Sequence, residues 1–138
     1  MSILVTGGAG YVGSHTVKRL VESGEKVIVI DDLSAGHKGA VSGAELVVGD
    51  FGDKDLMRNI IKSNDVEAVF HFAAFASVDE SVRDPKKYYF NNIANSLSML
   101  EVVFPFSFIP RPVSITESAL TIFFAVFETA HIPISIWI

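Results

Sequence analysis

Short apolar runs alternate with segments of helical periodicity over the first 103 residues of the chain. Four runs, at residues 2–5, 26–30, 44–48 and 68–72, are apolar at most positions rather than at every second one. Such runs are typical of parallel strands, because helices cover both faces of a parallel sheet. The pattern therefore predicts four buried, mostly parallel strands.

Three segments have the spacing of amphipathic helices. Residues 11–23 precede Gly24, a typical helix stop, residues 53–62 begin at a capping aspartate, and residues 85–103 begin with a first-turn proline. The order strand, helix, strand, strand, helix, strand, helix predicts an α/β fold. We expect a doubly wound, mostly parallel sheet with right-handed crossovers, whose fourth strand is left as an open edge.

Composition excludes several classes of protein. A length of 138 residues suits one domain, and 49% hydrophobic with 20% charged residues argues against a disordered chain. The net charge of −5 argues against a nucleic-acid partner. The chain has no cysteine, which rules out disulfides, zinc–thiolate sites and cysteine nucleophiles, and we identify no metal site.

The composition changes abruptly after Val103. All ten glycines lie between Gly7 and Gly52, whereas the last 35 residues hold three charged side chains and six of the eleven Phe. Residues 1–103 are therefore expected to form the domain, and residues 104–138 an atypical, hydrophobic C-terminal tail that raises the mean hydropathy to +0.40.

Neither end of the chain predicts an association with a membrane. The apolar stretch 118–127 in the tail suits one buried strand or short helix and is too short for a bilayer, which needs about 20 residues. The opening MSILVTGGAG lacks the basic region of a signal peptide. We expect a cytoplasmic protein.

A glycine-rich turn, TGGAGYVG, stands between the first strand and the first helix. Gly7 permits the tight turn, Gly10 lets backbone approach a pyrophosphate, and Gly13 lets the helix pack against the strand. The free amides at the helix N-terminus favour the anion. The turn therefore predicts a dinucleotide-binding site.

Asp31 supports this interpretation. It ends the second strand, about 20 residues after the glycines, where a carboxylate accepts hydrogen bonds from the adenosine ribose. Because a carboxylate repels a 2′-phosphate, Asp31 favours NAD over NADP. The alternative is an ordinary strand–helix turn with a solvated aspartate.

The segments TGGAGYVGSH, VIVIDDLSAGH, VVGDFGD, VFHFAAFASVDESV and YYFNNIANSLSMLEVV resemble, in this order, the UDP-glucose 4-epimerase family of the extended short-chain dehydrogenase/reductase superfamily. The resemblance covers about residues 1–103 and implies a Rossmann-type fold, truncated here. Asp79 stands where the family usually has glycine, which leaves the local backbone open.

The resemblance implies an NAD site built from several segments of the chain. The residues that it implies lie in the glycine turn, around the ribose and adenine, and beside the pyrophosphate and nicotinamide ribose. They are Gly7, Gly10, Tyr11, Val12 and Gly13; Asp31, Asp32, Leu33, Ser34, Ala35 and Gly36; Asp50 and Phe51; Phe72, Ala73, Ala74, Phe75 and Ala76; and Asn91.

Some of these residues also have simpler interpretations. Asp50 could end a strand, the segment Phe72–Ala74 could be ordinary core, and Asn91 could be a capping or surface amide. His71 is expected to be a hydrogen-bonded core histidine rather than a base.

The chemistry of the family lies beyond the resemblance. The family interconverts UDP-glucose and UDP-galactose through a 4-keto intermediate with bound NAD, using a tyrosine, a lysine four residues later, and a Ser or Thr. None of the three tyrosines in this chain has that lysine, and no Lys or Tyr follows Val103. We therefore expect an NAD-binding part without catalytic residues; the alternatives are a non-catalytic nucleotide-binding module and a non-functional remnant.

The resemblance also bears on partners and on the tail. The family usually dimerises through the helix matching residues 85–103 and its neighbour, and only the first is recognisable here. A homodimer is therefore an open alternative, as is binding of a UDP-sugar, whose half of the site is missing. The abrupt change after Val103 favours a shifted reading frame, or a joined unrelated sequence, as the origin of the tail.

Overall fold

A computed structural model describes residues 2–107 and 122–124 of the chain. Five parallel strands form one sheet in the order β3-β2-β1-β4-β5. This confirms the prediction of a parallel α/β fold. The strands are β1 (Ser2–Thr6), β2 (Val27–Asp31), β3 (Glu45–Val48), β4 (Val66–His71) and β5 (Ile122–Phe124).

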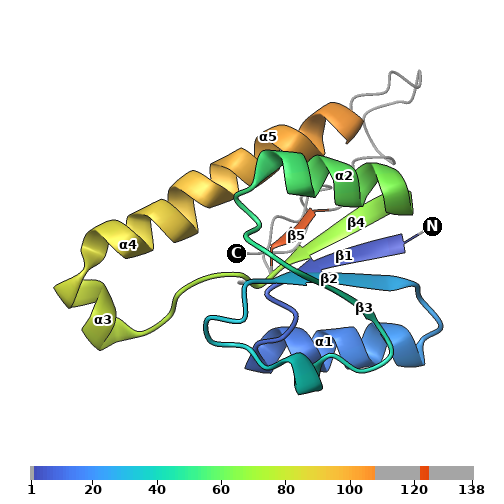
Figure 1. Cartoon of the computed structure of the whole chain (residues 1–138), viewed down its shortest axis with the longest axis horizontal. Coiled ribbons are helices and arrows are strands. Elements are labelled where there is room, and N and C mark those ends of the chain that lie inside the picture. The colour runs from blue at the N-terminus through green and yellow to red at the C-terminus, as the bar shows by residue number, and fades with distance from the viewer. Residues whose placement is uncertain (1, 108–121, 125–138) are drawn as a thin grey trace, which may run out of the picture.

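Helices cover both faces of the sheet, as predicted for a doubly wound fold. Helix α1 packs on one face, while α2 and α5 lie together on the other (Figure 1). The helical elements are α1 (Tyr11–Glu22), the 3₁₀ turn η1 (Lys38–Ala40), α2 (Lys54–Asn64), α3 (Val78–Arg83), α4 (Pro85–Tyr89), the π-helical segment η2 (Phe90–Asn95) and α5 (Ser96–Ser107).

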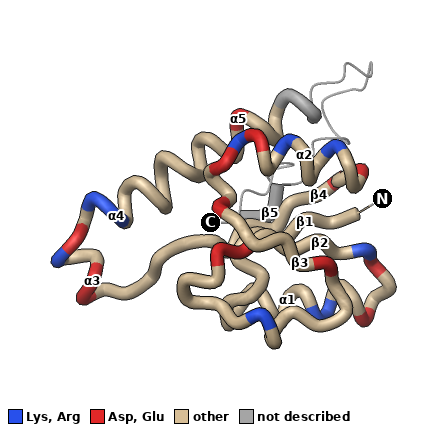
Figure 2. Tube along the Cα trace, viewed as in Figure 1, with Lys and Arg blue, Asp and Glu red and all other residues tan. Residues whose placement is uncertain are grey.

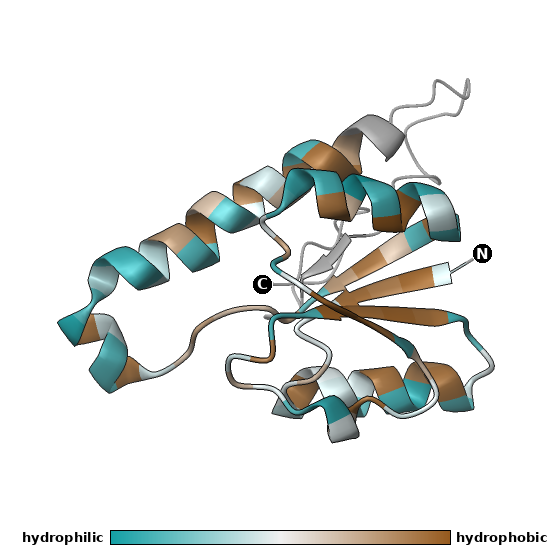
Figure 3. Ribbon diagram, viewed as in Figure 1, coloured by the Kyte–Doolittle hydropathy of each residue, from teal (hydrophilic) through white to brown (hydrophobic). Residues whose placement is uncertain are grey.

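The central strands are apolar at successive positions because successive side chains enter different layers of the core. Leu4 packs in the layer shared with α2 and α5, whereas its neighbour Val5 packs against Val17 of α1. Every residue of β2 is buried. Figure 3 shows this continuous hydrophobic colouring along the central strands, and Figure 2 shows most charged residues on helices and loops.

The predicted helix ends are confirmed. The Asp53 carboxylate accepts hydrogen bonds from the amides of Asp55 and Leu56 at 3.0 and 3.1 Å and caps α2. Gly24 has a φ of +85° just after α1, a conformation that glycine adopts without strain. Pro85 is in the first turn of α4.

The structure differs from the predicted single helix over residues 85–103 in two ways. It consists of α4, η2 and α5, because six residues widen into a π-helix, and it continues to Ser107 through Pro105. Helix α3 was not predicted, because it is only six residues long and its two apolar residues, Val78 and Val82, are too few to establish a helical period. Asp79 lies in the first turn of α3, so the backbone at this departure from the family pattern is helical.

The prediction that the fourth strand is an edge was wrong. Residues Ile122–Phe124 pair with Val69–His71, so part of the tail belongs to the sheet. This strand lies within residues 118–127, where a strand or a short helix was predicted. The remaining tail predictions, over residues 108–121 and 125–138, lie outside the described residues. Among the helices of the described part, none is long and apolar enough to cross a membrane.

The sheet order places a topological switch point between β1 and β4. Helix α1 leaves β1 toward one face, and the connections beyond β4 lead to the other, so the loops after these neighbouring strands diverge at their carboxyl ends (Figure 1). Ligands of open α/β sheets bind at such a switch point.

Candidate functional site

The glycine turn is held tightly against its surroundings at Gly7 and Gly13. Gly7 has a φ of +70°, and a Cβ there would lie 2.5 Å from the backbone nitrogen of Ala73, after β4. A Cβ on Gly13 would lie 2.2 Å from the carbonyl oxygen of Gly7. Both positions therefore require glycine for backbone packing, as predicted.

Gly10 differs from these two glycines. A Cβ there would meet only the Gly7 carbonyl oxygen, at the ordinary distance of 3.4 Å, and Gly10 lines a pocket. It is also the N-cap of α1, where no side chain caps the helix and no acidic residue occupies the first turn. The start of α1 thus presents backbone amides beside open space, an arrangement suited to an anion.

Asp31 braces the glycine turn from the end of β2. The residue is 8% exposed, and its Oδ2 accepts the Ala9 amide at 2.9 Å while its Oδ1 accepts the Leu33 amide at 2.9 Å. A carboxylate oxygen can accept more than one hydrogen bond. Asp31 can therefore hold these loops and still accept bonds from a ligand hydroxyl.

The loop after β2 is tied to the same alanine. The His37 amide donates to the Ala9 carbonyl at 3.0 Å, and Gly36 packs so closely that a Cβ would lie 2.8 Å from Ala9. Asp32 accepts bonds from the amide and hydroxyl of Ser34 at 2.9 and 2.7 Å, which shapes the loop internally. The two loops consequently form one connected wall.

The second wall comes from the loop after β3. The Oδ1 of Asp50 accepts the Gly52 amide at 2.7 Å, and both carboxylate oxygens accept Nδ2 of Asn95, at 3.2 and 3.3 Å. The Phe51 ring is buried in the core and contacts the ring of His71 with centroids 4.9 Å apart. Asp50 is thus more than a strand end, although Phe51 does act as core.

The third wall is the extended segment after β4, which carries Phe72 to Phe75. The Phe75 amide donates to Oδ1 of Asn92 at 2.9 Å, and Nδ2 of Asn92 donates to the Phe75 carbonyl at 2.9 Å. Asn91 lines the pocket and donates to Oδ1 of Asn92 at 2.9 Å. Residues of η2 therefore fasten this wall.

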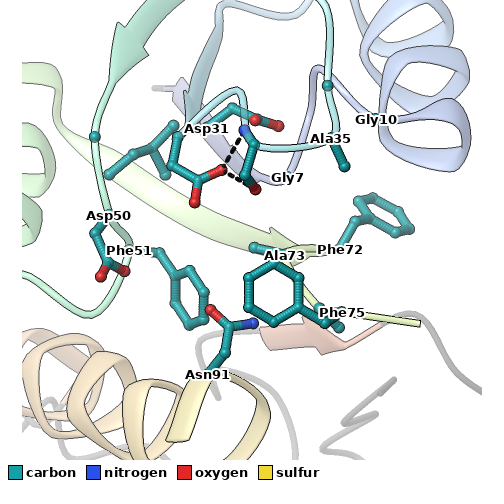
Figure 4. A pocket seen from close by; sticks show the side chains of 16 residues that line it. Gly7, Gly10, Asp31, Ala35, Asp50, Phe51, Phe72, Ala73, Phe75 and Asn91 are labelled. Atoms are coloured by element: carbon teal, nitrogen blue, oxygen red, sulfur yellow. Dashed lines mark hydrogen bonds between the residues drawn. The ribbon is translucent and has the colours of Figure 1, made fainter. Parts of the chain in front are cut away.

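These three walls enclose one pocket, shown in Figure 4. It brings together most of the residues that the sequence implied, namely Gly7, Gly10, Asp31, Asp32, Ser34, Ala35, Gly36, Asp50, Phe51, Phe72, Ala73, Ala74, Phe75 and Asn91. It encloses about 90 Å³, less than the roughly 300–1,000 Å³ of typical small-molecule pockets. A ligand as large as a dinucleotide would therefore lie across its mouth.

Five implied residues do not line the pocket: Tyr11, Val12, Gly13, Leu33 and Ala76. Tyr11 and Val12 are exposed on the first turn of α1. Their backbone amides belong to the N-terminal turn of the helix, which is the part of a helix that favours anions.

Sequence reasoning missed Ile30 and Gly49, which line the pocket at the ends of β2 and β3. Their position at strand ends was the available signal. It also missed Asn92, whose role depends on a contact between segments 17 residues apart.

His71 lies beneath the pocket as a buried, uncharged histidine. Its Nδ1 is 2.5 Å from the Thr6 hydroxyl and its Nε2 is 3.2 Å from the Ser96 hydroxyl, so it links β1, β4 and α5. Burial lowers the pKa of His71 from 6.5 to about 4. The prediction of a hydrogen-bonded core histidine is confirmed.

Tyr88 does not have the surroundings of a catalytic phenolate. Its hydroxyl donates to Glu80 at 2.8 Å, and desolvation together with this bond raises its pKa. The ammonium of Lys87 pairs with the same carboxylate at 2.6 Å and lies 4.5 Å from the ring centre of Phe75. Within the described residues, no three His, Asp or Glu side chains are grouped to hold a metal ion.

Curated relatives match about three quarters of the chain. UDP-glucose 4-epimerase of Streptococcus mutans is 49% identical over 109 residues, which cover 77% of this chain and 33% of that protein. The enzyme of the same name from Halalkalibacterium halodurans is 48% identical over 101 residues, covering 73% and 30%. The chain therefore spans about a third of the length of these relatives.

Solved structures agree in fold. UDP-glucose 4-epimerase from Brucella ovis in complex with NAD superposes with a TM-score of 0.71 at 44% identity, covering 73% of this chain and 31% of that one. The Thermus thermophilus enzyme in complex with NAD gives a TM-score of 0.73 at 36% identity, covering 77% and 34%. These neighbours establish the Rossmann-type architecture of the described residues.

A family model extends the match over most of the chain. The model of the NAD dependent epimerase/dehydratase family matches residues 3–109, a span that begins in β1 and includes all three walls of the pocket. The chain therefore belongs to the NAD dependent epimerase/dehydratase family.

Proposed function

We propose that this chain binds NAD across the pocket as the N-terminal cofactor-binding part of a UDP-glucose 4-epimerase. One observation carries the proposal: the uncapped start of α1 at Gly10 faces open space beside the buried carboxylate of Asp31. The first feature suits a pyrophosphate, and the second suits the ribose of a nucleotide.

The chain's own residues bind and orient the cofactor in this proposal. The amides at the start of α1 hold the pyrophosphate, and Asp31 accepts the ribose hydroxyls and repels a 2′-phosphate, which selects NAD over NADP. Asp50 and Phe51 bound the adenine, while the segment Phe72–Ala76 passes beside the nicotinamide ribose. NAD, when bound, supplies a hydride acceptor.

A matched pair of glycine variants tests the binding site. In Gly10→Ala the new methyl group has room in the fold but occupies the space where the pyrophosphate would approach. We expect the thermal unfolding midpoint to stay near that of the wild type while the Kd for NAD, measured by calorimetry, rises about tenfold or more, which corresponds to about 1.4 kcal/mol.

Gly39→Ala is the control, because a Cβ there has nothing within 4 Å and Gly39 does not line the pocket. The Kd of Gly39→Ala for NAD should equal that of the wild type. In a separate measurement, the wild type should bind NADP more weakly than NAD. A wild-type chain that binds no NAD would support the non-functional remnant instead, and an unchanged Kd in Gly10→Ala would contradict the proposed site.

The activity of the whole enzyme is also a proposal. UDP-glucose 4-epimerase of Thermotoga maritima has been solved with UDP-glucose, and we propose that this class of UDP-sugar is the substrate to which the cofactor-binding part contributes. These 138 residues contain no tyrosine with a lysine four residues later. The purified chain is expected to show no interconversion of UDP-glucose and UDP-galactose in a coupled assay, and measurable turnover would refute this expectation.

We further propose that the chain forms a homodimer in the cytoplasm. Five large apolar side chains are exposed along the continuous helix from α4 to α5, namely Tyr89, Phe90, Ile93, Leu97 and Phe104. Exposed apolar side chains gathered along one helix are a feature of interaction surfaces. Light scattering should give a dimer mass for the wild type and a monomer mass for Leu97→Glu; a monomeric wild type would refute the dimer.

The origin of the tail is a separate hypothesis. The match to the family model ends at residue 109, and no glycine, lysine or tyrosine follows Val103. We propose that a shifted reading frame, or a joined unrelated sequence, produces residues 104–138. Translation of the coding DNA in the other two frames should restore a Tyr-x-x-x-Lys segment; if neither frame does, the frameshift explanation is wrong.

A further inference from the structure

The π-helical segment η2 contacts two of the three pocket walls. It carries Asn91, Asn92 and Asn95, three amide side chains within six residues. Asn95 follows Asn91 by four residues and Asn92 by three, spacings that place side chains on the same side of a helix, and Asn91 also donates a hydrogen bond to Asn92. A π-helical insertion changes the angle of the side chains that follow it and is frequent at functional sites.

Asn92 fastens the wall after β4 by pairing with the backbone of a single residue. It accepts a hydrogen bond from the Phe75 amide and donates one to the Phe75 carbonyl, both at 2.9 Å, so one side chain satisfies both backbone polar groups of that residue. The donation from Asn91 to Oδ1 of Asn92 fixes which way the amide points. Asn92 itself does not line the pocket.

Asn95 fastens the wall after β3. It is 8% exposed, and its Nδ2 donates to both carboxylate oxygens of Asp50 at 3.2 and 3.3 Å. Its amide packs so closely on Gly52 that a Cβ there would lie 2.4 Å from Cγ of Asn95. The side chain therefore fixes both the carboxylate and the turn that follows it.

We propose that η2 is a positioning element of the cofactor pocket, in which Asn92 sets the wall after β4 and Asn95 sets the wall after β3. Neither residue contacts the cofactor; each acts through the backbone or carboxylate that it holds. This inference rests on the proposed NAD site. Since the wall held by Asn92 serves the nicotinamide half and the wall held by Asn95 serves the adenine half, the two residues have separable effects.

Binding of NAD and AMP to single variants tests the separation, because AMP carries only the adenosine half. Asn92→Ala should raise the Kd for NAD about tenfold, or about 1.4 kcal/mol, and leave the Kd for AMP within twofold of the wild type. Asn95→Ala should raise both Kd values by similar factors. Asn59→Ala is the matched control, because Asn59 is exposed on α2 and does not line the pocket.

The hydrogen bonds between Asn92 and the backbone of Phe75 can also be tested without a ligand. Hydrogen exchange of the Phe75 amide should be at least tenfold faster in Asn92→Ala than in the wild type or in Asn59→Ala, because the amide loses its acceptor. Asn92→Ser is a second neutral variant whose shorter side chain cannot bridge both backbone groups, and the same results are expected of it.

The binding measurements distinguish a failure of the proposed NAD site from a failure of the positioning role. Failure of the wild-type chain to bind NAD would overturn the proposed function and the positioning role with it. Wild-type binding together with an unchanged Kd for NAD in both Asn92 variants would overturn the positioning role alone. An equal loss of NAD and AMP binding in the Asn92 variants would also overturn it, because a general structural defect has no preference for one half of the dinucleotide.

Discussion

The burial of His71 predicts that the chain loses stability as the pH falls from about 6.5 to about 4. The ring is 6% exposed, it sits between the hydroxyls of Thr6 and Ser96, and burial lowers its pKa from 6.5 to about 4. Between these two values the unfolded chain binds a proton at this histidine and the folded chain does not, so protons favour unfolding.

The size of the effect follows from the difference in pKa. One pKa unit corresponds to about 1.4 kcal/mol, so the shift from 6.5 to about 4 amounts to about 3 kcal/mol. The stability gained by keeping His71 uncharged in the folded chain is fully present above pH 6.5. It decreases by up to about 1.4 kcal/mol per pH unit below that value and is lost below about pH 4. Because small domains are stable by about 5–15 kcal/mol, the loss is a large fraction of the total.

The variant His71→Gln isolates this contribution. Glutamine has a neutral side chain that does not titrate, so the variant loses the contacts of the ring at every pH but keeps no proton linkage at position 71. Urea denaturation from pH 7.5 to pH 4 should show that the wild-type free energy of unfolding falls more steeply than that of the variant. Their difference should narrow by about 3 kcal/mol over this range.

An independent measurement is the NMR titration of the His71 ring, which should remain unprotonated at pH 5. Parallel curves for the two proteins, or a His71 that titrates near 6.5, would show that the ring is accessible to water and that the reasoning is wrong.

Other substitutions have effects set by single contacts. Gly13→Ala forces a Cβ to within 2.2 Å of the Gly7 carbonyl and should lower the thermal unfolding midpoint by several degrees, in contrast to Gly10→Ala. Asp53→Ala removes the cap of α2 and should cost about 1 kcal/mol in a urea titration. Lys54→Ala breaks an exposed ion pair with Glu101, and the change in stability should stay below about 1 kcal/mol and vanish in high salt.

The fold could be predicted from the sequence because its signals are local. The alternation of apolar runs and helical periods predicts the first four strands and the helices between them in their order along the chain. Gly24, Asp53 and Pro85 mark helix ends through their own backbone preferences. The glycine turn and Asp31 were equally visible, because their spacing reflects a strand–helix–strand unit.

The parts that were missed depend on contacts between distant segments. Asn92 is indistinguishable from its neighbour Asn91 in sequence, and only the approach of Phe75 gives it a role. Helix α3 has only six residues and two apolar positions, too few for a helical period to be recognised. The pairing of Ile122–Phe124 with β4 joins residues far apart in the chain, and no local pattern predicts such a partner.

The hydrogen bonds of Asp31 limit how the cofactor preference of this fold can change. A switch to a phosphorylated cofactor requires removal of the carboxylate, yet the same group ties the Ala9 amide of the glycine turn to the Leu33 amide of the next loop. A serine at position 31 is too short to bridge both amides, so it would loosen the turn while removing the charge. Altered specificity therefore has to begin with a substitution elsewhere that first supports the turn, and the order of such changes is constrained for any lineage or design that starts from this pocket.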